Sequence, residues 1–334
     1  MRMSRWQWLA AGSLAALVAV FVWANRHDVP ATYRALTNAR PSWCLVASTL
    51  MVAWMVNDAL LQRATLRATG VELGVGSVAA GAAVAHSLNL TTKSGGMAGL
   101  AAMRAEARRA ALPERSVTGG YLLSGMLTEL AFAVALAASI AALAADGHLN
   151  AAECGAAAVF ALYAGSRVLV LVAAARNRDL LRRLSRIPVR ILAFIRRSGA
   201  PEASDRADEA ADDLFEALQK ARSSRRALAG ASVHALATEA IAVAIVWSCA
   251  RAVGSPVSSL DALVAYSVAG LFGIVGVVPG GLGFVEVSMG AVLVGFGVPG
   301  ATAAAIVLLY RAFELWIPIA IGGILAHRMR MVHR

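Results

Sequence analysis

The stretch Val278-Pro279-Gly280-Gly281-Leu282-Gly283-Phe284-Val285-Glu286 lies inside apolar sequence that carries almost no charge between residues 262 and 312. Pro279 removes a backbone N–H donor and the three glycines loosen the backbone, so we predict a break in a helix here. In hydrocarbon an unpaired backbone group costs several kcal/mol, and a broken helix must therefore be buried in protein or line a wet cavity. Glu286 follows the break, and an ionisable side chain at membrane depth is a candidate functional residue. The stretch predicts a binding site within a membrane.

The composition is typical of an integral membrane protein. Of the 334 residues, 59% are hydrophobic and 15% are charged, whereas soluble domains average about 25% charged residues. The net charge of +11 comes almost wholly from arginines beside apolar runs. This placement favours membrane orientation and contact with anionic lipid over nucleic-acid binding. The three cysteines lack metal-ligand spacing, so we expect neither a metal site nor a cofactor.

Six apolar runs are long enough to cross a bilayer as helices. Regions 74–112 and 260–298, which lie between them, each contain two shorter, Gly-rich apolar segments. We predict an all-α polytopic membrane protein with six long transmembrane helices and two broken helix pairs. Each pair either re-enters the membrane or crosses it as two thin spans. The six runs lie near residues 6–24, 42–61, 116–145, 151–175, 227–250 and 300–326.

Arginine asymmetry orients the chain, because cytoplasmic loops carry an excess of Lys and Arg. Loop 176–226 opens with an arginine cluster at 176–197, whereas the short loop 146–150 has no Lys or Arg. We therefore place loop 176–226 in the cytoplasm and loop 146–150 outside. Both termini are then cytoplasmic, pair 74–112 enters from the cytoplasm and pair 260–298 enters from outside. The arginine cluster is expected to meet anionic lipid headgroups, although a solvated helical hairpin packed on the membrane domain is the simpler interpretation.

Short matches at a fixed spacing indicate an internal repeat. Glu129 follows Gly95 by 34 residues, and Glu314 follows Gly280 by 34 residues. Since the charge pattern orients the matched elements in opposite directions, we predict two inverted-topology repeats. Such repeats place a substrate site at their interface near the bilayer midplane. The repeats would cover residues 1–145 and 146–326, with a cytoplasmic tail at 327–334.

The candidate binding residues are the glycines of the two breaks and the polar side chains nearby. Arg311 is suited to a lipid phosphate, but it can instead pair with Glu314 on the same helix or with Glu286. The acidic residues would balance charge or recognise a cationic group. The glycine pairs either begin half-helices whose free N–H groups face an anionic headgroup or permit close helix packing. The full set is Asn89, Lys93, Gly95, Gly96, Arg104, Glu129, Pro279, Gly280, Gly281, Gly283, Glu286, Arg311 and Glu314.

His234 and Glu239 are candidates for proton or ion coupling, because both lie in the apolar run 227–250. Hydrogen bonding between helices is the commoner role of such residues. The sequence contains no metalloprotease, serine-hydrolase or phosphate-loop motif, and these motifs are the usual signs of hydrolytic or phosphoryl-transfer chemistry. We therefore predict no catalytic residue.

Pro279-Gly280-Gly281-Leu282-Gly283 with Glu286, followed by Arg311 and Trp316-Ile317-Pro318, resembles the lysylphosphatidylglycerol synthase transmembrane family. This is the flippase-like domain of bacterial multiple-peptide-resistance factors. The resemblance extends back over Asn89–Arg104, where Met97 stands in place of the acidic residue that usually follows the glycines. It implies a stand-alone member in the bacterial inner membrane, without the aminoacyl-transferase domain, that moves or handles a lipid.

The leading hypothesis is a lipid translocase that moves an anionic, polyprenyl-linked or hopanoid-type lipid through a headgroup site at the midplane. The alternative is a membrane-embedded enzyme or an accessory subunit of a lipid or glycan biosynthesis pathway. A weaker hypothesis is an ion or small-solute carrier that uses His234 and Glu239. The expected partners are membrane lipids, with a second copy of the chain or enzymes of a lipid pathway as further candidates.

Overall fold

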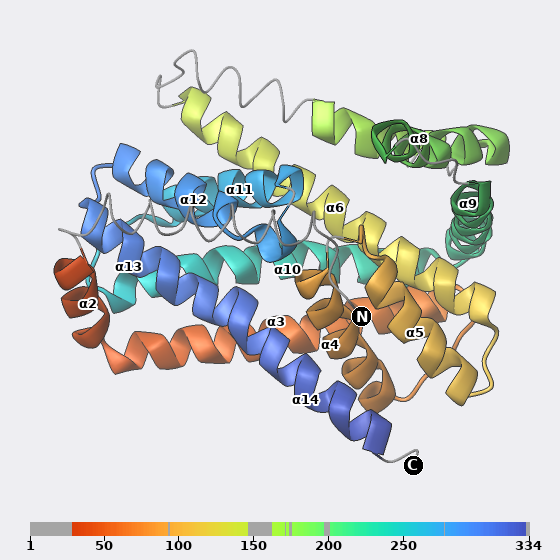
Figure 1. The fold of residues 1–334 in the computed structure, drawn as a ribbon, viewed down its shortest axis with the longest axis horizontal. Coiled ribbons are helices and arrows are strands. Elements are labelled where there is room, and N and C mark those ends of the chain that lie inside the picture. Colours follow the sequence, from red (N-terminus) through yellow and green to blue (C-terminus); the bar gives the residue numbers. More distant parts are fainter. Residues whose placement is uncertain are drawn as a thin grey trace.

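The computed structural model describes residues 29–92, 94–145, 162–170, 172–173, 176–196, 201–276 and 278–331. These residues form helices and short connections and contain no strand (Figure 1). Four helical segments are long and apolar enough to cross a membrane, which defines a polytopic membrane protein. They are α3 (Pro41–Ala68), α6 (Glu114–Ala145), α10 (Arg225–Ala252) and a composite of α13 (Gly300–Arg311), the π turn η2 (Ala312–Trp316) and α14 (Ile317–Met331).

These four segments coincide with four of the six predicted spans. The predicted span 6–24 lies outside the described residues, and span 151–175 is described only at 162–170 and 172–173, where it is helical. Helix α14 continues to Met331, so the chain is still helical in the region predicted as a tail. The remaining elements are α2 (Val29–Thr37), α4 (Val75–Thr91), α5 (Met97–Arg109), α8 (Arg178–Arg196), α9 (Pro201–Ser223), α11 (Ser259–Val275), the 3-10 turn η1 (Pro279–Gly281) and α12 (Phe284–Gly295).

Both long helices that form the central pair, α3 and α10, end in the same way. Gly70 and Gly254 have positive φ angles of 81° and 77°, and the N–H of the next residue donates to a carbonyl five residues back, at Leu66 and Ala250. This pattern is a glycine-terminated helix end, in which the left-handed residue turns the chain back over the last carbonyls. It gives a local reason for the repeated Arg-x-x-Gly sequence at these two places.

The two predicted broken pairs are helical hairpins in the structure. Helices α4 and α5 pack against each other, as do α11 and α12, and the described chain between them is non-helical at 92 and 94–96 and on both sides of η1. The first hairpin shares a buried cluster with Leu66 and Val117, near the end of α3 and the start of α6. The second shares a cluster with Ala47 and Cys249, near the start of α3 and the end of α10.

The hairpins therefore occupy opposite ends of the long helices, and their tips meet between them (Figure 1). A Cβ added to Gly280 in the second tip would lie 3.4 Å from the carbonyl oxygen of Leu90 in α4. The entry of the two pairs from opposite sides of the membrane, their inverted-repeat relation and their re-entrant nature stay predictions.

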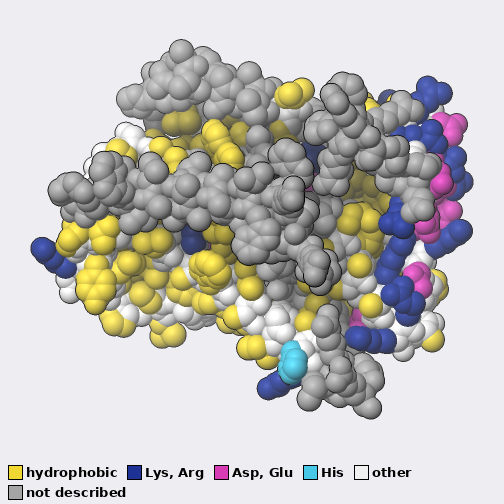
Figure 2. Space-filling view, viewed as in Figure 1, with side chains coloured by type: hydrophobic (Ala, Val, Ile, Leu, Met, Phe, Trp, Pro, Cys, Tyr) yellow, Lys and Arg dark blue, Asp and Glu magenta, His cyan; other side chains and the backbone are white. Residues whose placement is uncertain are grey.

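Helices α8 and α9 form a charged hairpin that packs against α6. Arg178 and Arg182 both donate to the Asp212 carboxylate, at 2.8 and 2.7 Å, and Arg186 pairs with Asp208. Hydrogen bonds from these arginines hold the pKa of Asp208 and of Asp212 below the usual value. Charged side chains accordingly gather at one end of the molecule (Figure 2). Binding of anionic headgroups here stays a prediction, and it must compete with these ion pairs.

The hairpin is joined to α5 by Asp213, whose side chain is 4% exposed and lies 3.6 Å from the Arg104 guanidinium. Burial, together with the neighbouring Glu209 carboxylate, raises the pKa of Asp213 to about 6. Because the folded-state pKa lies above the unfolded value, the ionised carboxylate lowers stability at neutral pH. This penalty is lost as pH falls through the folded pKa toward the unfolded one.

We expect Asp213→Asn to raise the midpoint of thermal unfolding at neutral pH, with the gain shrinking toward acidic pH. The change removes the desolvated charge while keeping the shape of the side chain. The measurement is the thermal midpoint of both proteins in one detergent across this pH range. Asp179→Asn is the control, since the Asp179 side chain is 79% exposed. A gain of equal size at every pH would contradict the assignment to Asp213 ionisation.

Candidate functional site

Arg311, at the end of α13, is the centre of the polar site. Its side chain is 3% exposed, and each guanidinium nitrogen has an acceptor. Nε donates to Glu286 Oε1 at 2.8 Å, Nη1 donates to Glu314 Oε2 at 2.5 Å, and Nη2 donates to the carbonyl oxygen of Gly280 at 2.6 Å. One side chain thus ties α13 to the start of α12, to the π turn η2 and to the break η1.

The local sequence explains why this break forms. Gly280 and Gly281 both have φ angles of 63°, which is a left-handed conformation that favours glycine. Pro279 opens the short turn, and Glu286 accepts the N–H of Gly283 at 2.6 Å. A carboxylate three residues inside a helix start is a stabilising partner for that start. The glycine-rich stretch therefore ends one half-helix and begins the next.

The π turn that carries Glu314 also has a local cause. Pro318 lies four residues after Glu314 and lacks the N–H that would bond the Glu314 carbonyl in a regular α-helix. Single π turns inside α-helices are frequent at functional sites. Here the turn covers Ala312–Trp316, and Glu314 both pairs with Arg311 and lines a cavity.

The charge of this cluster bears on what it can bind. One guanidinium faces two carboxylates, so the ionised cluster carries a net negative charge. A lipid phosphate near Arg311 would meet two carboxylates, which repel it. The cluster is better suited to a ligand group that donates hydrogen bonds or carries positive charge.

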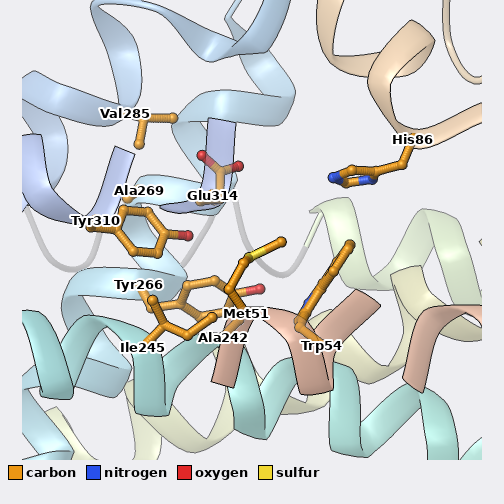
Figure 3. Close-up of a pocket in the computed structure, with 11 residues that line it drawn as sticks. Met51, Trp54, His86, Ala242, Ile245, Tyr266, Ala269, Val285, Tyr310 and Glu314 are labelled. Atoms are coloured by element: carbon orange, nitrogen blue, oxygen red, sulfur yellow. The ribbon is translucent and has the colours of Figure 1, made fainter. Parts of the chain in front are cut away.

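A cavity of about 140 Å³ lies next to the cluster. Figure 3 shows Glu314, Tyr310 and Tyr266 facing one another across part of it, with Trp54 and His86 beyond them. The Trp54 and His86 rings are 4.7 Å apart between centroids. Residues from α3, α4, α10, α11, α12, α13 and η2 line the cavity, which therefore lies between the two hairpins. It has room for a few water molecules or a small part of a headgroup.

The first break is held by neutral side chains. Asn89 donates to the Tyr121 hydroxyl at 2.8 Å and accepts the N–H of Gly99 at 2.9 Å, while Ser94 accepts the N–H of Ala98 at 3.0 Å. A Cβ on Gly99 would lie 2.6 Å from the Asn89 amide nitrogen. An anion would therefore have to displace Ser94 and Asn89 to reach the N–H groups of Ala98 and Gly99 at the start of α5. Lys93 lies outside the described residues.

Two other predicted residues lie away from the breaks and bind elsewhere. Arg104 donates to Thr118 Oγ1 at 2.8 Å and faces Asp213 of α9. Glu129 forms a 2.8 Å ion pair with Arg167, with both side chains partly exposed. The sequence analysis did not single out Arg167, although a charged residue inside the predicted span 151–175 was a usable signal.

The two predicted coupling residues lie in hydrogen bonds between helices. His234 Nδ1 lies 2.7 Å from Asn57 Oδ1, and the Asn57 amide donates to the His234 carbonyl oxygen and to Thr238. Glu239 is buried and accepts a 2.7 Å hydrogen bond from Tyr266. Since Tyr266 lines the cavity, Glu239 lies directly behind the cavity wall. Asn57, a polar residue within the apolar run 42–61, was an overlooked signal of the His234 hydrogen bonds.

Membrane-length helices around two broken hairpins, with a buried charged cluster at their junction, define a polytopic membrane protein with a polar site inside the membrane. The family described as the lysylphosphatidylglycerol synthase TM region matches residues 8–322, and the chain belongs to this family. A UPF0104 membrane protein from Methanothermobacter thermautotrophicus is 40% identical over 73 residues. That match covers 22% of this chain and 22% of the relative. The resemblance inferred from the Pro-Gly-Gly stretch is thus confirmed.

Proposed function

We propose that this protein is a lipid translocase of the inner membrane, whose headgroup site is the cavity between the two hairpin tips. The observation that carries the proposal is Glu314, a carboxylate that faces this cavity while bound to Arg311. Intramembrane carboxylates are costly and mark substrate or ion pathways. Membership in a family named for a lipid synthase supports a lipid as the substrate.

The hairpin arrangement supports movement across the membrane rather than binding alone. Each hairpin fills one end of the long helices, so that displacing either tip would open the cavity toward one side. Alternating access in many transporters is a movement of one repeat against another around a fixed midplane site. The tips meet at Gly280 and Leu90. Gly280 has no side chain that could interlock with the other tip and hinder its movement.

The charge of the cluster narrows the headgroup chemistry. Each guanidinium nitrogen of Arg311 already donates to a protein oxygen, and the two carboxylates beside it would repel a phosphate. We therefore propose that the headgroup presents an amine or hydroxyl group to Glu314. The tyrosine and tryptophan side chains of the cavity suit such a group, since aromatic faces attract cations and Tyr hydroxyls exchange hydrogen bonds.

The test is transbilayer movement of fluorescent lipids in vesicles that contain the purified full chain. The wild type is expected to move at least one lipid class faster than protein-free vesicles do. Glu314→Gln should slow that lipid by about tenfold or more, because a hydrogen bond to a charged group contributes roughly 1.5–3 kcal/mol. Glu72→Gln is the matched control, since Glu72 lies on an exposed connection between α3 and α4.

Two outcomes would contradict the proposal. Wild-type protein that accelerates none of the neutral, zwitterionic, anionic and cationic lipids would favour an accessory subunit or a membrane-embedded enzyme. Full activity in a folded Glu314→Gln protein would contradict the assignment of the headgroup site to this cavity.

A further inference from the structure

Asp58 is a charged residue near the middle of the membrane-length helix α3, and it is only partly exposed. Among the described residues, no Lys, Arg or His side chain forms an ion pair with it. An isolated carboxylate at membrane depth is disfavoured unless something neutralises it. The family motif and the Arg311 cluster do not include Asp58.

Gln62, one helical turn further along α3, provides the second observation. Its amide nitrogen donates to Asp58 Oδ2 at 3.0 Å, and the residue is 6% exposed. Its carbonyl oxygen Oε1 is buried and has no hydrogen-bond partner in the described part of the chain. Rotating the amide would bring Oε1 against the carboxylate and leave the nitrogen unbound. Among the described residues, Asp58 thus has no positively charged partner and Gln62 Oε1 has no hydrogen-bond donor.

The position of Asp58 links this pair to the cavity. Trp54 lines the cavity and lies four residues before Asp58, so both side chains lie on the same face of α3. Helix α6, which packs against α3, carries Tyr121, and Tyr121 binds Asn89 at the first break. The pair therefore lies on the face of α3 that also lines the cavity.

The other elements packed against α3 present few ionisable groups to this region. Helix α4 presents His86, whose ring lies tilted against Trp54, and α10 presents His234, which binds Asn57. The π turn η2 contributes Glu314. Helix α9 contributes the apolar Leu218 and Ala221, which share a buried cluster with Leu61.

We propose that the Asp58 carboxylate and Gln62 Oε1 bind a monovalent cation, either a proton or Na⁺. A proton from the aqueous side would bond to an Asp58 oxygen and neutralise it, and the resulting O–H group would donate to Gln62 after side-chain rotation. Na⁺ would instead accept oxygen lone pairs from both side chains. If the lipid translocase function holds, this cation supplies a gradient that drives lipid movement.

The test is infrared difference spectroscopy of the full chain in lipid nanodiscs. One arm steps the pH without Na⁺, and the other adds Na⁺ at constant pH. We expect a change in the carboxyl stretching bands that is lost in Asp58→Asn and altered in Gln62→Leu. It should persist in the control Asp179→Asn. A change with pH alone identifies a proton, and a change on adding Na⁺ at constant pH identifies Na⁺. Identical difference spectra for wild type and folded Asp58→Asn would overturn the site.

A second measurement separates this site from the translocase function. In vesicles, lipid movement by the wild type should respond to a proton or Na⁺ gradient, whereas movement by Asp58→Asn should not. Absence of lipid movement in the wild type, with the Asp58 infrared change intact, would reject the translocase function and leave the cation site supported. Lipid movement that ignores both gradients in the wild type would reject the coupling.

Discussion

Replacing Arg311 with alanine is expected to destabilise the protein by about 3 kcal/mol, the lower end of the range for breaking a buried ion pair. The change leaves Glu286 and Glu314 facing each other without a cation and removes the donor to the Gly280 carbonyl. We choose the lower end because the Glu314 side chain keeps 34% of its surface exposed. The measurement is thermal or denaturant unfolding of purified wild type and variant in the same detergent.

Two further variants show whether charge and geometry cause this loss. Arg311→Lys keeps the charge, but an ammonium cannot reproduce the planar fork that meets three acceptors, so we expect an intermediate loss. A triple variant with Arg311→Met, Glu286→Gln and Glu314→Gln removes all the charges and should recover part of the stability. If Arg311→Ala unfolds like the wild type, another group must balance the carboxylates. Because folding itself is at risk, loss of lipid movement in Arg311→Ala alone would not identify a phosphate site.

Gly322→Ala is expected to destabilise the protein by a similar amount, about 3 kcal/mol, the upper end of the range for overpacking. Gly322 lies where α14 crosses α4. An added Cβ would lie 2.7 Å from the Ala83 carbonyl oxygen and closer still to the Ser87 Cβ. Neither neighbour is the end of a flexible side chain, so the helices must separate. The separation would also weaken the 3.3 Å hydrogen bond from Ser87 to the Ile319 carbonyl.

The adjacent glycine is a matched control. A Cβ on Gly323 would have no atom within 4 Å, so Gly323→Ala should instead stabilise the helix by up to about 1 kcal/mol. The difference in unfolding free energy between the two variants tests the helix crossing directly. Equal effects of the two substitutions would show that α14 does not pack on α4 through Gly322.

Much of the architecture follows from the sequence because its causes are local. Apolar runs such as 42–61 and 227–250 predict α3 and α10 by length and composition. Pro279 and the glycines beside it predict the second break, since they remove a donor and permit positive φ. The family resemblance rests on the same stretch. The sequence also indicates two possible partners of Arg311. Glu314 lies three residues away on the same helix, and Glu286 belongs to the broken segment.

The binding state of the candidate residues depends on contacts between distant segments. Arg104 carries the same charge as Arg311, but it faces the acidic α9 rather than a break. Asn89 holds the first break only because Tyr121, 32 residues away, meets it. Asp58 drew no notice in the sequence, since one acidic residue in an apolar run gives no sign of whether a cation lies nearby.

The sequence by itself determined the class of protein, the membrane-length helices and the two helix breaks, because hydropathy and backbone freedom act over a few residues. Only the tertiary structure decided that each nitrogen of the Arg311 guanidinium has an acceptor, that a small cavity lies between the hairpins and that Gln62 keeps an unbound carbonyl oxygen. These properties depend on which surfaces meet when the helices pack. Packing fixes the distances between charges and hydrogen-bonding groups, and no local pattern specifies those distances.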